Sequence, residues 1–224
     1  IMDNSRIPVL GHADGVCHVY VDKAADLDMA VSIAVDSKTQ NVAVCNAMET
    51  LLVHRDVAAA YLPKLLPALQ AKNVKVLGDE TVQAIIPVLP ATEEDWHAEY
   101  LDYTLSIKVV DSLDEAIAHI NRYGSHHTDA IVTADEAAAQ AFLTRVDSAG
   151  VYHNVSTRFA DGFVYGFGAE VGIATGKIHA RGPMGLEGLT TYKYKLLGSG
   201  QLMAEMKNGT RQYTHVLLNE DCPL

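Results

Sequence analysis

Long apolar runs, cysteine and positive charge are all scarce in this sequence. No stretch of its 224 residues approaches the ~20 apolar residues of a bilayer span, and residues 1–14 hold no apolar signal-peptide core. Three cysteines are too few for a disulfide scaffold, which is typical of a reducing, cytoplasmic location. Seventeen Lys and Arg against 28 Asp and Glu give a net charge of −11. Because phosphate neutralisation needs a basic surface, we expect neither a nucleic-acid nor a membrane partner.

The familiar metal and nucleotide motifs are also missing. The sequence contains no HExxH, no CxxC, no P-loop and no GxGxxG after a strand. Of its ten histidines only His126 and His127 are adjacent, and neighbours on a strand point to opposite faces. We therefore expect no metal site and no recognisable nucleotide site within this chain.

What the sequence does contain is an alternation of strand-like and helix-like segments. Strand-like runs lie at 17–21, 50–53, 74–77, 105–110, 130–132 and 150–152, and helical spacing at 26–38, 57–72, 112–120 and 136–145. Pro63 and Pro67 predict that the second helix kinks or ends early. The alternation indicates an α/β fold with a mainly parallel sheet covered by helices.

Two further segments are not part of this alternation. Residues 91–102 carry five acidic side chains and no Lys or Arg, so we interpret them as a solvated acidic loop. After residue 200, two predicted strands, 201–206 and 211–217, flank Asn208 and Gly209, and an Asn-Gly pair predicts a β-hairpin tail.

Cys45 is the cysteine best placed for chemistry. It falls between a predicted helix and a predicted strand, where a thiol can face a cleft and backbone N–H groups can stabilise its thiolate. Cys17 lies within an apolar strand, which is typical of a buried, inert thiol, and Cys222 lies two residues from the end. Position alone leaves a structural role for Cys45 open as well.

A basic segment stands out in this acidic chain. Residues 177–195 include Lys177, Arg181, Lys193 and Lys195 against Glu187 alone, within a stretch rich in glycine. Backbone N–H groups together with arginine bind phosphate or carboxylate well, so an anion pocket is one interpretation. A set of unrelated surface charges is the other.

Four segments, residues 7–15, 45–54, 110–131 and 168–190, resemble γ-glutamyl phosphate reductases in sequence and in order. That family belongs to the aldehyde dehydrogenase superfamily, so the resemblance implies an aldehyde-dehydrogenase-type catalytic (thiol) domain over residues 1–196. Residues 197–224 would then form a hairpin tail used in homo-oligomer contacts. The resemblance starts where the family's N-terminal NADP-binding half ends, which implies that this half, with most of the NADPH site, is absent from this chain.

The resemblance also implies an activity and its residues. Members reduce L-glutamyl 5-phosphate with NADPH to L-glutamate 5-semialdehyde, releasing phosphate, in proline biosynthesis. Cys45 corresponds to the nucleophile that forms a thioester, and N–H groups at Cys45 and Asn46 are candidates for the oxyanion site.

For the substrate anions we expect Arg181 first, then Lys177 and Arg158. His127, Thr128 and Asp129 belong to the family motif, with Asp129 suited to the substrate ammonium; a capped strand start is their structural alternative. The segment at residues 10–15 lacks the glutamate with which hydrolytic superfamily members activate water.

Two other functions remain compatible with the sequence. One is a non-catalytic, regulatory or oligomerising half that lacks a cofactor domain. The other is an acylating aldehyde dehydrogenase with another substrate.

Overall fold

The computed structural model describes residues 1, 4–178 and 180–216. Contacts between residues divide the chain into two units, Ile1–Thr190 and Thr191–Leu224, which are described separately here. The sequence places a boundary six residues later, after residue 196, and the roles assigned to the two parts stay predictions. None of the helices among the described residues is both long and apolar enough to cross a membrane.

The first unit is built on a seven-stranded, entirely parallel sheet. The strands are β1 (Cys17–Val21), β2 (Met48–His54), β3 (Lys75–Gly78), β4 (Leu89–Pro90), β5 (Thr104–Val110), β6 (Thr128–Val132) and β7 (Gly150–His153). Their order is β4-β3-β5-β2-β1-β6-β7, and each neighbouring pair is parallel. The predicted parallel α/β sheet is confirmed, with the longest strands at its centre.

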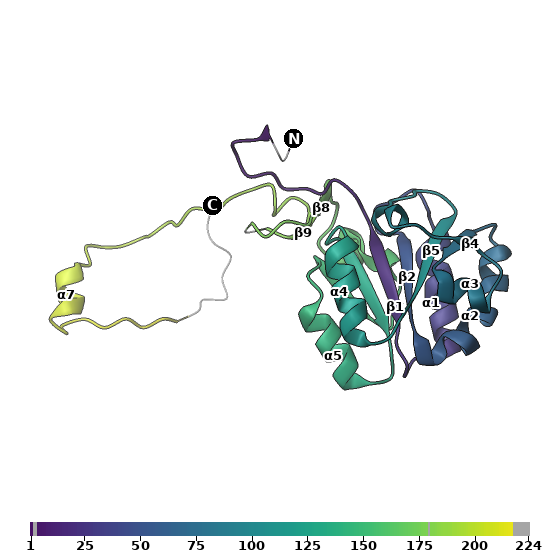
Figure 1. Ribbon diagram of the computed structural model, residues 1–224. Coiled ribbons are helices and arrows are strands. Elements are labelled where there is room, and N and C mark those ends of the chain that lie inside the picture. The colour runs from purple at the N-terminus through teal and green to yellow at the C-terminus, as the bar shows by residue number, and fades with distance from the viewer. Residues whose placement is uncertain (2–3, 179, 217–224) are drawn as a thin grey trace. The chain divides into compact units, whose positions relative to one another are not determined.

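Helices cover both faces of this sheet (Figure 1). One face carries α1 (Leu27–Thr39), α2 (Arg55–Gln70) and α3 (Glu80–Ile85), and the other carries α4 (Leu113–Tyr123) and α5 (Glu136–Arg145). Each of these helices begins with a side-chain cap; Ser112 Oγ, for example, accepts the Glu115 N–H at the predicted start of α4. Short helices η2 (Glu94–His97), η3 (Thr157–Phe159) and α6 (Gly162–Tyr165) lie in the loops.

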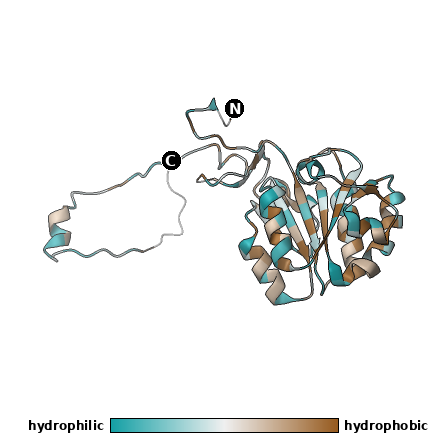
Figure 2. Ribbon diagram, viewed as in Figure 1, coloured by the Kyte–Doolittle hydropathy of each residue, from teal (hydrophilic) through white to brown (hydrophobic). Residues whose placement is uncertain are grey.

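Alternating side chains of the central strands supply two separate cores. Val19 and Val21 of β1 pack toward α1 and α2, whereas Tyr20 between them packs toward α4 and α5. Figure 2 shows hydrophobic colour recurring along the strands while hydrophilic colour alternates with it on the helices. A strand buried on both faces needs nearly continuous apolar sequence, and the central strands have it.

Helix α2 runs through both prolines, so the predicted alternative that it ends early at Pro63 or Pro67 is wrong. The two prolines are four residues apart and both are exposed, so the carbonyls that lose their N–H partners face solvent. On the opposite side Tyr61, Leu62 and Leu65 are fully buried, and their packing offsets the lost hydrogen bonds.

The C-terminal tail is not a β-hairpin in the residues that the structure describes. Helix α7 (Met203–Lys207) occupies the first predicted strand, and residues 211–216 form no strand, while Leu217 lies outside the described residues. Asn208 and Gly209 end this helix instead, with Gly209 in the left-handed region at a φ of 77°. The antiparallel pair that does form is β8 (Gly172–Ala174) with β9 (Gly182–Met184), earlier in the chain.

Candidate active site

Cys45 lies in a turn directly before β2, at the amino edge of the parallel sheet. The turn is closed by a hydrogen bond from the Ala47 N–H to the Val44 carbonyl. Cys45 is half-buried, whereas Cys17 on the neighbouring strand is fully buried and its Sγ–H faces the Cys45 carbonyl at 3.3 Å. The predicted contrast between an accessible Cys45 and a buried Cys17 is confirmed; Cys222 lies outside the described residues.

His127 is the side chain that meets the thiol. Its Nε2 lies 3.2 Å from Cys45 Sγ, and its Nδ1 lies 2.9 Å from Thr128 Oγ1. The preceding residue, His126, adopts a φ of 61° and is held by its ring against the Asp147 carbonyl at 2.6 Å. That turn directs the His127 ring toward the thiol at the start of β6. The sequence assigned His127 to the substrate end and missed this contact.

A pocket of about 490 Å³ opens beside the thiol. Its lining includes Cys45, Asn46 and side chains of α1, η3 and α6, and Arg158 is the one cation among the described residues that line it. The Arg158 Nε donates to Gln40 Oε1 at 2.9 Å, which leaves the remaining guanidinium N–H groups available. The geometry thus favours Arg158, one of the two weaker predicted cations, as the anion partner at this site.

Burial and two nearby carboxylates keep the Cys45 thiol protonated. Burial raises the pKa of Cys45, and Glu99 and Glu170 raise it further, whereas the backbone N–H of Cys45 and Arg158 lower it. Burial lowers the pKa of His127 to about 4, and nearby His12 lowers it as well. Both partners are therefore neutral at pH 7 before a substrate arrives.

The candidate oxyanion groups are present in the same turn. Among the described residues the N–H groups of Cys45 and Asn46 donate to no other residue, so neither is committed to another protein acceptor. The Asn46 side chain donates through Nδ2 to the Ala160 carbonyl at 2.8 Å, while its buried Oδ1 has no partner. The amide is thus fixed against the loop and its oxygen stays unsatisfied beside the pocket.

Two glutamates reach this region from segments that the sequence did not connect with it. Glu99, predicted to lie in a solvated acidic loop, accepts the Gly15 N–H through Oε1 at 2.9 Å. Glu170 accepts the Gly162 N–H through Oε2 at 2.9 Å and lines the thiol pocket. The segment at residues 10–15 indeed brings no glutamate, but these two place carboxylates near the thiol.

A buried ion pair braces the turn from both ends. Lys38 at the end of α1 and Glu49 in β2 are both fully buried, with Nζ and Oε2 2.5 Å apart. Glu49 Oε1 also accepts the Leu101 N–H at 3.3 Å, next to Glu99. Burial raises the pKa of Glu49 to about 7 even though Lys38 lowers it. The pair links α1, β2 and the loop that holds Gly15.

Arg181 and Lys177 meet at one carboxylate rather than at the thiol pocket. Arg181 Nη1 lies 3.1 Å from Asp147 Oδ1, its Nε donates to the Thr175 carbonyl, and Lys177 Nζ lies 2.5 Å from Asp147 Oδ2. Because Asp147 also holds the His126 ring, this cluster supports the corner that carries His127. The predicted basic segment is thereby divided, since Lys193 and Lys195 belong to the second unit.

Thr128 and Asp129 are buried in β6. The Oδ1 atom of Asp129 accepts the backbone N–H of His18 and lies 2.9 Å from the Nδ1 of the same histidine. Its Oδ2 atom accepts the Ser148 hydroxyl. With both oxygens engaged and no exposed surface, Asp129 has no free acceptor for a substrate ammonium. The structure instead matches the alternative of a braced strand start.

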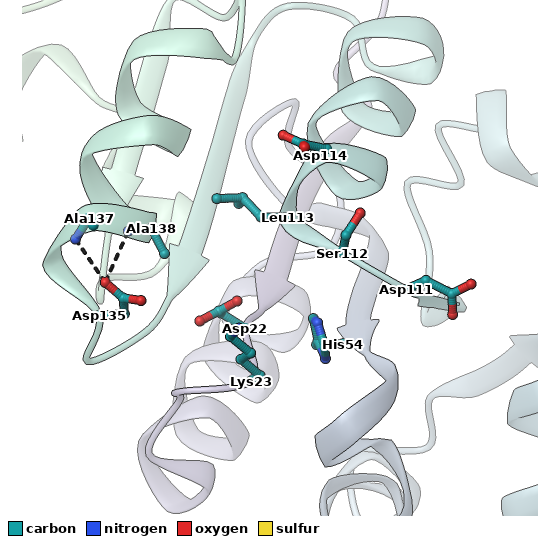
Figure 3. Close-up of a pocket in the computed structure, with 10 residues that line it drawn as sticks. All are labelled: Asp22, Lys23, His54, Asp111, Ser112, Leu113, Asp114, Asp135, Ala137 and Ala138. Carbon is teal, nitrogen blue, oxygen red and sulfur yellow. Dashed lines mark hydrogen bonds between the residues drawn. The ribbon is translucent and has the colours of Figure 1, made fainter.

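A second pocket, of about 450 Å³, lies at the opposite, carboxyl edge of the sheet (Figure 3). Residues at or after the carboxyl ends of β1, β2, β5 and β6 line it, and they are Asp22, Lys23, His54, Asp111, Ser112, Leu113, Asp114, Asp135, Ala137 and Ala138. Asp135 caps α5 by accepting the N–H groups of Ala137 and Ala138. Its lining holds four aspartates and no cysteine, whereas Cys45 lines the pocket at the amino edge.

Comparison with known proteins agrees with this geometry. No family model matches the sequence. The γ-glutamyl phosphate reductase of Acetivibrio thermocellus is 61% identical over 224 residues, which are 100% of this chain and 52% of that protein. The reductase of Pelotomaculum thermopropionicum is 59% identical over 221 residues, 99% of this chain and 51% of that protein.

Solved structures show the same relationship. The crystal structure of γ-glutamyl phosphate reductase from Thermotoga maritima has a TM-score of 0.86 and 48% identity, covering 90% of this chain and 49% of that one. An acetylating aldehyde dehydrogenase from Geobacillus thermoglucosidasius shares the fold, with a TM-score of 0.62, 16% identity, and coverage of 88% and 55%. The chain spans about half the length of the curated relatives it matches, and over that span it is similar to γ-glutamyl phosphate reductases along nearly all of its own residues.

Proposed function

We propose that this chain supplies the thiol chemistry of a γ-glutamyl phosphate reductase, which converts L-glutamyl 5-phosphate to L-glutamate 5-semialdehyde with NADPH in proline biosynthesis. The observation that carries the proposal is the contact of 3.2 Å between Cys45 Sγ and His127 Nε2 beside an open pocket. A thiol next to a neutral imidazole is the arrangement that nucleophilic catalysis requires. A cytoplasmic, homo-oligomeric enzyme without nucleic-acid or membrane partners remains part of this proposal.

His127 accepts the Cys45 proton as the sulfur attacks the acyl carbonyl. With its Nδ1–H donated to Thr128 Oγ1, the His127 Nε2 carries a lone pair toward the thiol. Carbon–sulfur bond formation makes a tetrahedral oxyanion, which the free N–H groups of Cys45 and Asn46 can stabilise; one such donor contributes about 3 kcal/mol. Cleavage of the carbon–oxygen bond then releases phosphate and leaves a thioester on Cys45.

Arg158 is the group proposed to hold the substrate's negative charge, because it lines the thiol pocket. Arg181 and Lys177 act indirectly in this scheme, since both pair with Asp147 and thereby support the corner that positions His127. Thr128 contributes by orienting the His127 ring, and Asp129 by bracing β6.

Neither of the two pockets described above fits the pyrophosphate of NADPH. A dinucleotide site needs N–H groups or cations for the pyrophosphate, whereas the pocket at the carboxyl edge has four aspartates against one lysine. The thiol pocket offers one arginine. NADPH supplies hydride in the reaction proposed for the full-length protein, and we assign most of its site to the part of the relatives that this chain does not cover.

Incubation with acetyl phosphate, followed by intact mass and phosphate measurement, tests the proposal. The 224-residue chain should gain one acetyl group on Cys45 and release one phosphate, without sustained NADPH oxidation. Cys45→Ser should abolish acylation, and His127→Ala should slow it about 100-fold because a proton acceptor is lost. Arg158→Ala should raise the acetyl phosphate concentration needed for half-maximal rate more than Arg181→Ala does.

Three outcomes would count against parts of the scheme. A chain that stays unacylated would favour the non-catalytic alternative. Sustained NADPH oxidation by the chain alone would contradict the assignment of the cofactor site. If Arg181→Ala raised the acetyl phosphate concentration needed for half-maximal rate more than Arg158→Ala does, the anion site would lie in the basic segment instead.

A further inference from the structure

Three metal-type donors converge at the thiol. His12, Cys45 and His127 each offer one ligand atom, and these atoms lie within 4.8 Å of one another. The Cys45 Sγ and His127 Nε2 are already 3.2 Å apart. A tetrahedral zinc site with bonds of about 2.0–2.3 Å needs ligand atoms roughly 3.5 Å apart. One pair is therefore within the range needed for a common ion, and the other two pairs, within 4.8 Å, need to close by at most about 1.3 Å.

The two imidazoles are oriented as metal ligands usually are. His12 Nδ1 lies 2.9 Å from the Ile173 carbonyl, so it carries the proton and leaves a lone pair on Nε2. His127 Nδ1 is held at 2.9 Å by Thr128 Oγ1. Ring centroids of His12 and His127 are 5.0 Å apart, with the planes nearly perpendicular at 88°. Hydrogen bonds of this kind to the second ring nitrogen fix ligating histidines in known metal sites.

The surrounding charge also suits a dication. Glu170 lines the thiol pocket, and Glu99 accepts the Gly15 N–H beside the thiol turn. Two carboxylates in this region give it negative charge, which attracts a divalent cation. One sulfur and two imidazole nitrogens are soft and borderline donors, which select zinc-class ions over Mg²⁺ or Ca²⁺.

We propose that a zinc-class divalent cation binds Cys45, His12 and His127, leaving a fourth position for water. The Cys45 S–H bond breaks as the sulfur–metal bond forms, one proton is released, and no oxidation occurs. While its sulfur is bound to the metal, Cys45 cannot attack an acyl group, so the metal reversibly inhibits the nucleophile. Only this silencing rests on the proposed function; the binding itself does not.

Cobalt absorption and zinc calorimetry on the 224-residue chain test the proposal, in a Cys222→Ser background that removes the terminal thiol. We expect one Co²⁺ per chain with a thiolate-to-cobalt band in the near ultraviolet, absent in Cys45→Ser. His12→Ala should weaken Zn²⁺ binding at least tenfold while metal-free acylation by acetyl phosphate continues. The matched control is His97→Ala, an exposed histidine in η2, which should leave zinc binding unchanged.

Zinc should also protect Cys45 from iodoacetamide, and EDTA should restore labelling. A cobalt band that survives Cys45→Ser, or zinc affinity equal in His12→Ala and His97→Ala, would overturn the site. Zinc binding without any acylation of the metal-free chain would leave the metal site standing and refute the proposed function. The two hypotheses can thus fail separately.

Discussion

The backbone of Gly15 passes so close to the Cys45 carbonyl that a Cβ on residue 15 would lie 2.1 Å from that oxygen. No real pair of atoms approaches so closely, so a side chain at position 15 must push the thiol turn away. The Gly15 N–H is fixed at the same time by Glu99 Oε1 at 2.9 Å. The two segments therefore hold one another in place, and Cys45 depends on a glycine thirty residues earlier.

Gly15→Ala should accordingly damage the thiol site. We expect the free energy of unfolding to decrease by about 1–3 kcal/mol, as at other overpacked sites, and the rate of Cys45 alkylation to change. Gly11→Ala is the matched control, because a Cβ there meets nothing within 4 Å. Urea unfolding of both variants checks this; equal stability would show that the close approach relaxes freely.

Cys45 should react with iodoacetamide much faster than Cys17 does. Cys17 is fully buried, and burial raises its pKa well above the ordinary value. The pKa of Cys45 is raised as well, so its alkylation rate should reach half its maximum above the pH of about 8.5 at which a free cysteine titrates. Peptide mapping across pH 6–10 measures both rates. A plateau at neutral pH would instead indicate a resting thiolate–imidazolium pair.

Removing only one residue of the Lys38–Glu49 pair should destabilise the protein more than replacing both residues. Glu49→Gln leaves the fully buried Lys38 without a counter-charge, so we expect about 3–5 kcal/mol of destabilisation in urea unfolding. Replacing both residues, Lys38→Met with Glu49→Leu, should recover most of that loss because no charge stays buried. A double variant that is no more stable than Glu49→Gln would contradict this account.

His119 should make the protein less stable in mild acid. Burial lowers its pKa to about 2, and nearby His18 and Lys108 lower it too, whereas an unfolded histidine titrates near 6.5. Above pH 6.5 the His119 side chain is neutral in both the folded and the unfolded chain. Below pH 6.5 it binds a proton in the unfolded chain but not in the folded one, so the free energy of unfolding decreases as the pH is lowered. Between pH 7 and 5 this loss is about 2 kcal/mol.

Replacement by an uncharged residue isolates this effect. His119→Leu should lose about 2 kcal/mol less stability than the parent between pH 7 and 5, while His97→Leu, at an exposed position, should follow the parent. The comparison cancels the opposite contribution of Glu49, whose raised pKa favours the native state as pH falls. Parallel pH curves for the parent and His119→Leu would refute the assignment.

Local sequence signals were sufficient for most of the fold. Alternating periodicity located β1, α1, β5, α4, β6 and α5, since each has either a buried strand pattern or a capped helical one. The failures occurred where tertiary packing outweighed a local rule. Pro63 and Pro67 are tolerated because α2 exposes them, and Asn208 and Gly209 end a helix because the preceding residues are helix formers.

The site was only partly predictable for a different reason. The sequence indicated Cys45, yet it could not show that β1 lies between β2 and β6, which is what brings residue 127 to residue 45. Adjacent histidines were judged by strand alternation, but His126 lies outside β6 in a left-handed turn. Each of the four resembling segments contributes to the site, through His12, Cys45, His127 and Glu170, and that convergence was the available signal.

The separation of these residues along the chain ties reactivity to folding itself. His127 follows Cys45 by 82 residues, and their contact needs β6 to pair with β1 after a long loop has closed. A chain that has not yet built that pairing has an ordinary cysteine at position 45, without a histidine beside it. During synthesis the nucleophile is therefore assembled only after residue 127 has been made and β6 has paired with β1.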